Sequence, residues 1–264
     1  MPAPDERICS RTGLALVASP VSALRIARES YGPLDPVARA SNSGPEAWSR
    51  YDTPGRTIYA CADRVTAYME LLAPYRTDVS RERRALQPIA DALGKNLDEL
   101  WRDIVAEWDE TGSMKASWLP RTFREGRRVY ALAFPAGSWI DNTATETITA
   151  LEDLHEHPWP TADGELEEPL TLAHLTGDDR TLTTAIARVL RDEVTLDDGT
   201  RPLGVRFLSK HGHPATGTGL CWAYWMRDVD SGVPEPTTIT HHASIGEHDP
   251  DLAAVQAYCR IRAR

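Results

Sequence analysis

Three residues close together in the sequence have side chains that could bind and activate a charged ligand. Arg50, Tyr59 and Glu70 lie within a span of 21 residues. The planar guanidinium of an arginine can bind a phosphate group through two parallel hydrogen bonds. A tyrosine ring can stack on a planar cation, which favours binding by about 0.5–2 kcal/mol. A fixed carboxylate stabilises positive charge that develops beside it in a transition state. Together, these residue types suit an anionic ligand that also carries a planar cation.

The local sequence places these residues around a loop, a short strand and a helix. Residues 31–56 contain many Gly, Pro, Ser and Asn residues, which predicts a long structured loop of the kind that often carries function. Residues 57–60 read as a short strand. Asp63 can cap a helix that begins at Arg64 and that Pro74 ends.

Glu70 falls off the apolar face of this expected helix. The buried stripe at helical spacing consists of Val65, Tyr68, Met69 and Leu72. At about 100° per residue, Glu70 lies about 140° from Val65. We therefore expect its carboxylate to face a cleft.

Two stretches of sequence carry a resemblance to a known family. The first is Trp48–Ala60, which contains Arg50-Tyr51-Asp52-Thr53-Pro54-Gly55 and Ile58-Tyr59-Ala60 and is followed by Ala67-Tyr68-Met69-Glu70. The second is Gly204–Gly212, which contains Ser209-Lys210-His211. In order and in residue type they resemble the RES domain, a family named for its Arg, Glu and Ser. That family has an arginine in a loop ending in Pro-Gly, a strand with Tyr-x-Ala, and a glutamate eleven residues after the tyrosine. The resemblance, which begins near Arg25-Ile26-Ala27, spans most of residues 20–227.

The resemblance implies an ADP-ribosyltransferase-like fold and an enzyme that degrades NAD as a toxin held in check by an antitoxin. In such an enzyme Arg25 and Arg50 would hold the pyrophosphate or ribose of NAD, and Tyr59 would contact the nicotinamide. Glu70 would act at the ribose and Ser209 would hydrogen-bond the cofactor. Ser231 and Ser244 are the alternatives to Ser209.

The chemistry of NAD agrees with these residue types. Cleavage of the nicotinamide–ribose bond expels a neutral pyridine, so it requires no general acid. One glutamate beside the developing oxocarbenium ion could supply most of the electrostatic stabilisation. Inorganic phosphate or water would accept the ADP-ribose, and a phosphate acceptor would need a nearby cation, for which Lys210 and His211 are candidates.

Two other functions remain open on the sequence. The protein could transfer ADP-ribose to a protein side chain, or it could be an inactive partner-binding module on the same fold. The resemblance implies a small helix-turn-helix antitoxin as the partner.

Composition predicts a folded, cytoplasmic protein. With 264 residues, 41% of them hydrophobic, the chain can bury a sizeable core. The formal charge of −10 argues against nucleic acid or an anionic membrane surface as a direct partner. The sequence contains no apolar run of the roughly 18 residues that a membrane helix needs.

Cysteines and histidines do not predict a metal site. The four cysteines are far apart and form no Cys-x-x-Cys pair, which indicates reduced thiols. His211 and His213 could share one face of a strand, and His241 and His242 are adjacent, but no third ligand follows from the spacing. We therefore expect no metal.

The order of elements predicts an α+β fold with a mixed or antiparallel sheet. Strands are expected at 128–134, 204–208 and 220–226, and helices at 143–154 and 181–192. No Walker loop or Gly-x-Gly-x-x-Gly motif is present. The resemblance implies one RES-type NAD-binding domain over residues 15–240, and we expect a tail with a short helix over residues 241–264.

Residues 76–120 are expected to be a helical insertion in this domain. Residues 81–108 have a helical pattern, and residues 89–100 superficially look like the turn of a helix-turn-helix. Carboxylates such as Asp98, Glu99 and Asp103 would face DNA phosphates in that arrangement, which opposes binding. A structural helical hairpin is the better interpretation.

Overall fold

A computed structural model describes residues 6–18, 21–76, 83–111, 118–155, 157–227 and 235–263 of the chain. Its strands are β1 (Glu6–Ile8), β2 (Ala15–Ala18), β3 (Ser22–Arg28), β4 (Thr57–Cys61), β5 (Trp118–Leu119), β6 (Arg127–Ala133), β7 (Ser138–Asp141), β8 (Pro160–Thr161), β9 (Gly164–Glu165), β10 (Gly204–Leu208), β11 (Leu220–Trp225), β12 (Thr238–Ser244) and β13 (Arg262–Ala263). Its α-helices are α1 (Arg64–Leu72), α3 (Gln87–Ala92), α4 (Leu97–Thr111), α5 (Arg121–Glu125), α6 (Thr145–Leu154), α7 (Leu172–Thr176), α8 (Arg180–Asp192) and α10 (Pro250–Cys259), and short 3-10 helices are η1 (Pro45–Ala47) and η2 (Ala73–Tyr75).

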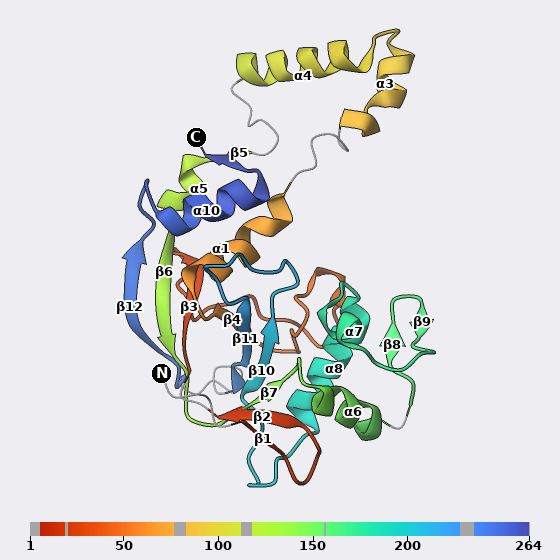
Figure 1. Cartoon of the computed structure of the whole chain (residues 1–264), viewed down its shortest axis with the longest axis vertical. Coiled ribbons are helices and arrows are strands. Elements are labelled where there is room, and N and C mark those ends of the chain that lie inside the picture. The colour runs from red at the N-terminus through yellow and green to blue at the C-terminus, as the bar shows by residue number, and fades with distance from the viewer. Residues whose placement is uncertain are drawn as a thin grey trace.

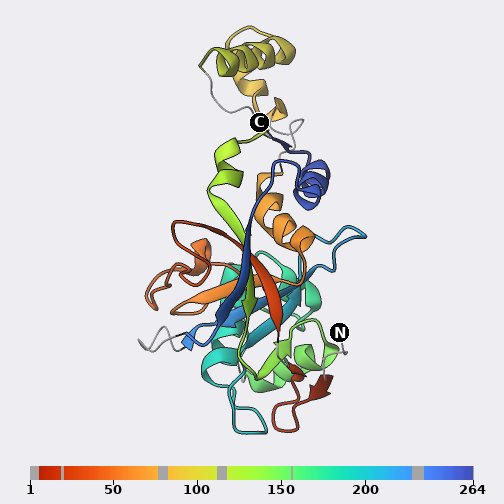
Figure 2. The same cartoon turned by 90° about the vertical axis from the view of Figure 1, so that its left-hand side faces the viewer.

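Nine of the described strands form one mixed sheet, in the order β1-β2-β7-β10-β11-β4-β3-β6-β12. Neighbouring strands are antiparallel except β7 and β10, which are parallel. Helices pack against this sheet (Figures 1 and 2), and the mixture confirms the expected α+β class.

Alternation along the strands divides the core between the two faces of the sheet. On β4, Ile58 and Ala60 pack into a cluster that also contains aromatic residues of β6, β7 and β11. Tyr59 and Cys61 point to the opposite face, as the two-residue period of a strand requires. That opposite face is the one on which the helices lie.

Two groups of helices cover this face. Helices α6, α7 and α8 pack over β2, β7 and β10, and α1, α5 and α10 pack near β3 and β6 (Figure 1). Asp249 joins α1 to α10, because it caps α10 and accepts a hydrogen bond of 2.9 Å from the Tyr68 hydroxyl. The part of the sheet that lies between the two groups of helices lines a cleft.

Part of the expected C-terminal tail belongs to the main sheet, whereas β13 pairs with β5 in a separate two-stranded sheet. Strand β12 pairs with β6 from Thr238 to Ser244, so the predicted division at residue 240 falls inside a strand. Helix α10 follows at Pro250 and packs on α1.

In the described part of the segment expected as a helical hairpin, helices α3 and α4 stand apart from the sheet (Figures 1 and 2). The chain turns at Gly94, which has a φ of 62°. Asn96 and Glu99 then form reciprocal side-chain to backbone hydrogen bonds of 2.8 and 3.1 Å that cap α4. Arg81, where the helical pattern was expected to begin, lies outside the described residues.

None of the described helices is long and apolar enough to cross a membrane.

Candidate active site

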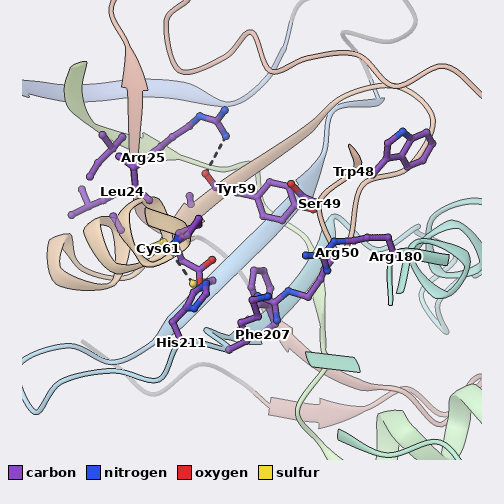
Figure 3. Close-up of a pocket in the computed structure, with 18 residues that line it drawn as sticks. Leu24, Arg25, Trp48, Ser49, Arg50, Tyr59, Cys61, Arg180, Phe207 and His211 are labelled. Carbon is purple, nitrogen blue, oxygen red and sulfur yellow. Dashed lines mark hydrogen bonds between the residues drawn. The ribbon is translucent and has the colours of Figure 1, made fainter. Parts of the chain in front are cut away.

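A cleft of about 550 Å³ lies between the two groups of helices, with the sheet as its floor. This volume is within the ~300–1,000 Å³ of small-molecule sites. Strands β3, β4, β10 and β11 supply the floor, α1 supplies one wall, and the loop before β4 with the start of α8 supplies the other. Figure 3 shows Trp48, Arg50 and Arg180 at one end and Cys61 and His211 at the other, with Tyr59 and Phe207 between them. The other lining residues are Leu24, Arg25, Ile26, Ser49, Ala60, Ala67, Glu70, Leu71, Pro74, Lys210 and Cys221.

Glu70 lines the cleft from α1. Asp63 caps this helix by accepting a hydrogen bond of 2.7 Å from the Thr66 backbone NH. Tyr68 and Leu72 are fully buried on the apolar face, which leaves Glu70 at the side that meets the cleft. The Glu70 Oε1 atom is buried, and it has no hydrogen-bond partner among the described residues. A buried carboxylate oxygen without a partner is costly, and such groups are found at functional sites.

Arg50 lies on the opposite wall and is only 6% exposed. One terminal nitrogen donates a hydrogen bond of 3.1 Å to the Thr176 carbonyl. Its guanidinium carbon lies 5.2 Å from the centre of the Phe207 ring, in cation–π range. The packed ring and the carbonyl together fix the direction of the guanidinium.

The two residues after Arg50 anchor its loop. The Tyr51 hydroxyl donates to the Leu175 carbonyl at 2.8 Å, and the Trp225 indole donates to the Tyr51 carbonyl at 3.1 Å. The Asp52 carboxylate accepts from the Ser49 backbone NH at 2.9 Å and from Arg39 at 2.8 Å. Arg50 is therefore held by a rigid support, which limits the entropy lost when a ligand binds.

Tyr59 contributes a fixed ring at the middle of the cleft. Its hydroxyl oxygen accepts a hydrogen bond of 3.0 Å from the Tyr51 backbone NH. Burial, followed by the nearby negative charge of Asp52, raises the pKa of the Tyr59 phenol well above its ordinary value. The phenol thus stays neutral, and the ring rather than the hydroxyl is offered to a ligand.

Arg25 approaches the cleft from β3, beside the position where Leu24 pairs with Cys61 of β4. It donates a hydrogen bond of 3.1 Å to the Tyr59 carbonyl (Figure 3), and its Nε atom is buried with no partner among the described residues. Burial lowers the pKa of Arg25 to about 10, which keeps the side chain charged at neutral pH. This residue supports the strand that carries Tyr59 and also lines the cleft.

Ser209 is the predicted site residue that the structure does not place among the lining residues. It is buried at the end of β10, where its hydroxyl accepts a hydrogen bond of 3.2 Å from the His211 backbone NH. The turn that it stabilises brings Lys210 and His211 to the cleft instead. Of the alternatives, Ser244 lies on β12 and accepts from Arg128 at 2.9 Å, and Ser231 lies outside the described residues.

From the sequence, His211 and Lys210 were expected only as cations that bind a phosphate acceptor. Burial lowers the pKa of His211 from its ordinary value, although the charge of Glu70 opposes this shift, so the imidazole is neutral at pH 7. Lys210 and Arg180 both pair with Asp178, an exposed carboxylate at the edge of the cleft.

Two lining features had no separate signal in the sequence. Arg180 is the first residue of α8, after the capping residue Asp179. The sequence motif of a helix start does not predict that Arg180 lines the same cleft as Arg50. Cys61 and Cys221 are opposite one another on β4 and β11, with sulfur atoms 3.6 Å apart. The hydrogen bond with Cys61 and burial raise the pKa of Cys221, so the Cys221 thiol stays protonated.

The described residues contain no group of three or more His, Cys, Asp or Glu side chains arranged to hold a metal ion.

Comparison with known proteins identifies no family. No family model matches the sequence, and no curated protein matches it. Among solved structures, a chain of the crystal structure of the M. tuberculosis MbcT–MbcA toxin–antitoxin complex can be superposed with a TM-score of 0.41 at 11% sequence identity. The superposition covers 93% of this chain and 92% of that one.

Proposed function

We propose that the cleft binds NAD and cleaves its nicotinamide–ribose bond, transferring ADP-ribose to phosphate or water. The observation that carries this proposal is the Glu70 carboxylate, which has an unpartnered buried oxygen in a cleft that arginines and aromatic rings line. A carboxylate oxygen that has no hydrogen-bond donor among the described residues could accept from a ribose hydroxyl, and the carboxylate could stabilise the oxocarbenium ion.

The cationic end of the cleft suits the pyrophosphate. Arg50 uses one nitrogen on the Thr176 carbonyl, and its remaining donors are available to phosphate oxygens. Arg180 lies beside it (Figure 3) and is held by Asp178 and the Gly177 carbonyl. Two arginines from different elements could thus bind two phosphate groups in a fixed orientation.

The middle of the cleft suits the nicotinamide. Tyr59 and Phe207 have ring centres 6.3 Å apart and meet edge to face. A pyridinium that stacks on one of these rings gains a cation–π interaction, which is lost when neutral nicotinamide forms. This placement would put the scissile carbon between the rings and Glu70.

The reaction balances without an additional cofactor. The bond between the ribose C1′ and the nicotinamide nitrogen breaks, and both electrons go to the nitrogen. An oxygen of phosphate or water then attacks C1′ and forms the new bond. Neutral His211 could accept the proton that an attacking water loses, whereas Lys210 could orient phosphate.

The cellular role that we propose is that of a toxin in the cytoplasm, controlled by an antitoxin. This part of the proposal depends on the resemblance of the Arg50–Glu70 region to the RES family. Expression of the wild type without a partner should lower cellular NAD and stop growth, and Glu70→Gln should do neither.

Incubation of the purified protein with NAD, with and without phosphate, tests the activity directly. We expect free nicotinamide together with either ADP-ribose or a phosphorylated ADP-ribose, and mass spectrometry separates these products. Arg50→Ala should raise KM at least about tenfold, because it removes a charge-assisted contact, whereas Arg102→Ala on the exposed face of α4 should match the wild type. The proposal is wrong if the folded protein releases no nicotinamide. If the ADP-ribose is found attached to protein, the activity is instead the transfer of ADP-ribose to a protein side chain.

A further inference from the structure

A second cavity, of about 420 Å³, lies beside the cleft. One wall is a single face of α8, which presents Thr181, Thr184, Ala185 and Arg188 at helical spacing. Trp48 and its loop form the facing wall, and Trp159 closes the end. We call this space the Trp159 cavity.

The Trp159 cavity continues from the cationic end of the cleft. Trp48 lines both spaces, and the consecutive residues Arg180 and Thr181 line one each. Figure 3 shows Trp48 beside Arg180 and Arg50, on the opposite side of the view from His211. A ligand whose phosphates are bound by these arginines would therefore have its other end directed toward Trp48.

The residues at the end of the cavity are suited to a flat heteroaromatic group. The His155 and Trp159 rings are stacked, with centres 4.1 Å apart and planes 21° apart. Trp159 is 4% exposed, and its indole Nε1 atom is buried with no hydrogen-bond partner among the described residues. An indole NH can only donate, so its natural partner is an acceptor such as a ring nitrogen.

The wall formed by α8 adds acceptors and a small residue. The Thr184 hydroxyl donates to the Arg180 carbonyl, which leaves its oxygen lone pairs for an amino group. Ala185 is small and half-buried, so it leaves room for a ring beside the helix. Donor, acceptor and aromatic surfaces together match an aminopurine.

We propose that the Trp159 cavity binds the adenosine half of the dinucleotide. This inference rests on the proposed function, because it assumes that nicotinamide and pyrophosphate occupy the cleft. Adenine would receive the Trp159 NH at a ring nitrogen and lie against the aromatic residues of the cavity. Binding energy from this remote half would then hold the reacting ribose beside Glu70.

Nicotinamide mononucleotide gives a sharp test, because it has the reacting bond but no adenosine. Ala185→Phe should fill the cavity, and Trp159→Phe should remove its NH donor while retaining an aromatic ring. We expect both variants to raise KM for NAD at least about tenfold and to leave kcat/KM for the mononucleotide unchanged. Ala257→Phe, at an exposed position of α10, is the matched control and should behave as the wild type.

Thermal unfolding followed by circular dichroism should show that each variant is folded before its kinetics are compared. The subsite is refuted if the folded variants turn over NAD as the wild type does, or if they lose NAD and mononucleotide turnover to the same degree.

Direct binding of AMP separates this inference from the proposed activity. If the wild type cleaves neither substrate, the proposed function fails, and calorimetry with AMP then decides on the cavity alone. Binding of AMP that Ala185→Phe abolishes and Ala257→Phe retains would support the subsite. Equal affinity in all three proteins, or no binding to the wild type, would refute it.

Discussion

Single side chains at the cleft are arranged so that one carboxylate oxygen lacks a partner in the described part of the chain, while neighbouring side chains have theirs. The hydroxyl of Tyr59 and the guanidinium of Arg50 each have a protein partner, and the buried Oε1 atom of Glu70 has none among the described residues. A buried oxygen without a hydrogen bond destabilises the folded protein. This arrangement is explained if a ligand hydroxyl donates the missing hydrogen bond to Glu70.

Asp63 is the residue that orients the helix carrying Glu70. Its carboxylate accepts from the backbone NH groups of Thr66 and Thr218, at 2.7 and 2.9 Å, and so joins α1 to the loop before β11. Burial alone would raise the pKa of Asp63, but these hydrogen bonds outweigh it and lower the pKa.

Asp63→Asn should therefore reduce the free energy of unfolding in a pH-dependent way. Because the folded-state pKa is lowered, the contribution of the charge is complete above the unfolded pKa of about 3.9 and is lost as pH falls through the folded value. We expect the variant to be about 0.5–1.5 kcal/mol less stable than the wild type at pH 7, and the gap to shrink below pH 4. Urea unfolding of both proteins between pH 7 and below pH 4 measures this difference in the free energy of unfolding, with Asp163→Asn at an exposed turn as control. A gap that is constant or widens in acid would contradict this role.

The sequence predicted which side chains line the cleft better in the Arg50–Glu70 segment than after β10. Asp63 and the apolar stripe on α1 determine where Glu70 points, and both are local features. Ser209 and His211 are two residues apart in a turn, and only the turn geometry determines which of them faces the cleft. A sequence motif carries no information of that kind.

At the scale of elements, the cleft depends on close approach between β10 and β11. Gly204 pairs with Tyr224, and a Cβ atom at Gly204 would lie 1.9 Å from the Ala223 carbonyl oxygen. That distance is far below van der Waals contact, so the two strands could not keep their register.

Gly204→Ala should consequently destabilise the protein by at least about 1–3 kcal/mol, the usual cost of overpacking. Gly246→Ala is the matched control, because a Cβ atom there meets nothing within 4 Å, and it should change stability by no more than about 0.5 kcal/mol. Chemical denaturation measures the free energy of unfolding of both variants. Equal stability of the two variants would show that β10 can move away from β11 without loss.

Elements with a strong local sequence pattern were predictable, and elements without one were not. Strand β10 and helix α8 were expected from alternation and from a capped amphipathic run, and the structure has them at Gly204–Leu208 and Arg180–Asp192. Strand β12 was expected as part of a tail, because its residues are polar and mostly exposed and so show no apolar alternation. Its place is set by pairing with β6, a long-range contact.

For the whole molecule, the body and the α3–α4 segment are built differently. The three buried clusters draw on the sheet and the helices around it, and no described residue of 83–111 belongs to them. The α3–α4 segment instead has its own contacts, including an edge-to-face pair of Trp101 and Trp108 with centres 5.7 Å apart.

Replacing residues 77–117 by a short Gly-Ser linker should therefore leave the body folded and active. We expect an apparent Tm within about 4 °C of the wild type, equivalent to roughly 1 kcal/mol or less, and unchanged kcat/KM for NAD. Calorimetry and nicotinamide release check the two expectations. Loss of the cooperative transition would show that the segment is part of the core.

The central claim is that the Glu70 carboxylate stabilises the ribose cation as nicotinamide leaves. The most direct measurement is nicotinamide release from NAD by the wild type, Glu70→Gln and the control Glu146→Gln, an exposed glutamate in the first turn of α6. The amide keeps the shape of the side chain and removes its charge, so kcat should fall at least about 100-fold while the Kd for NAD changes little. The control should match the wild type. A Glu70→Gln enzyme that retains wild-type kcat would contradict the account.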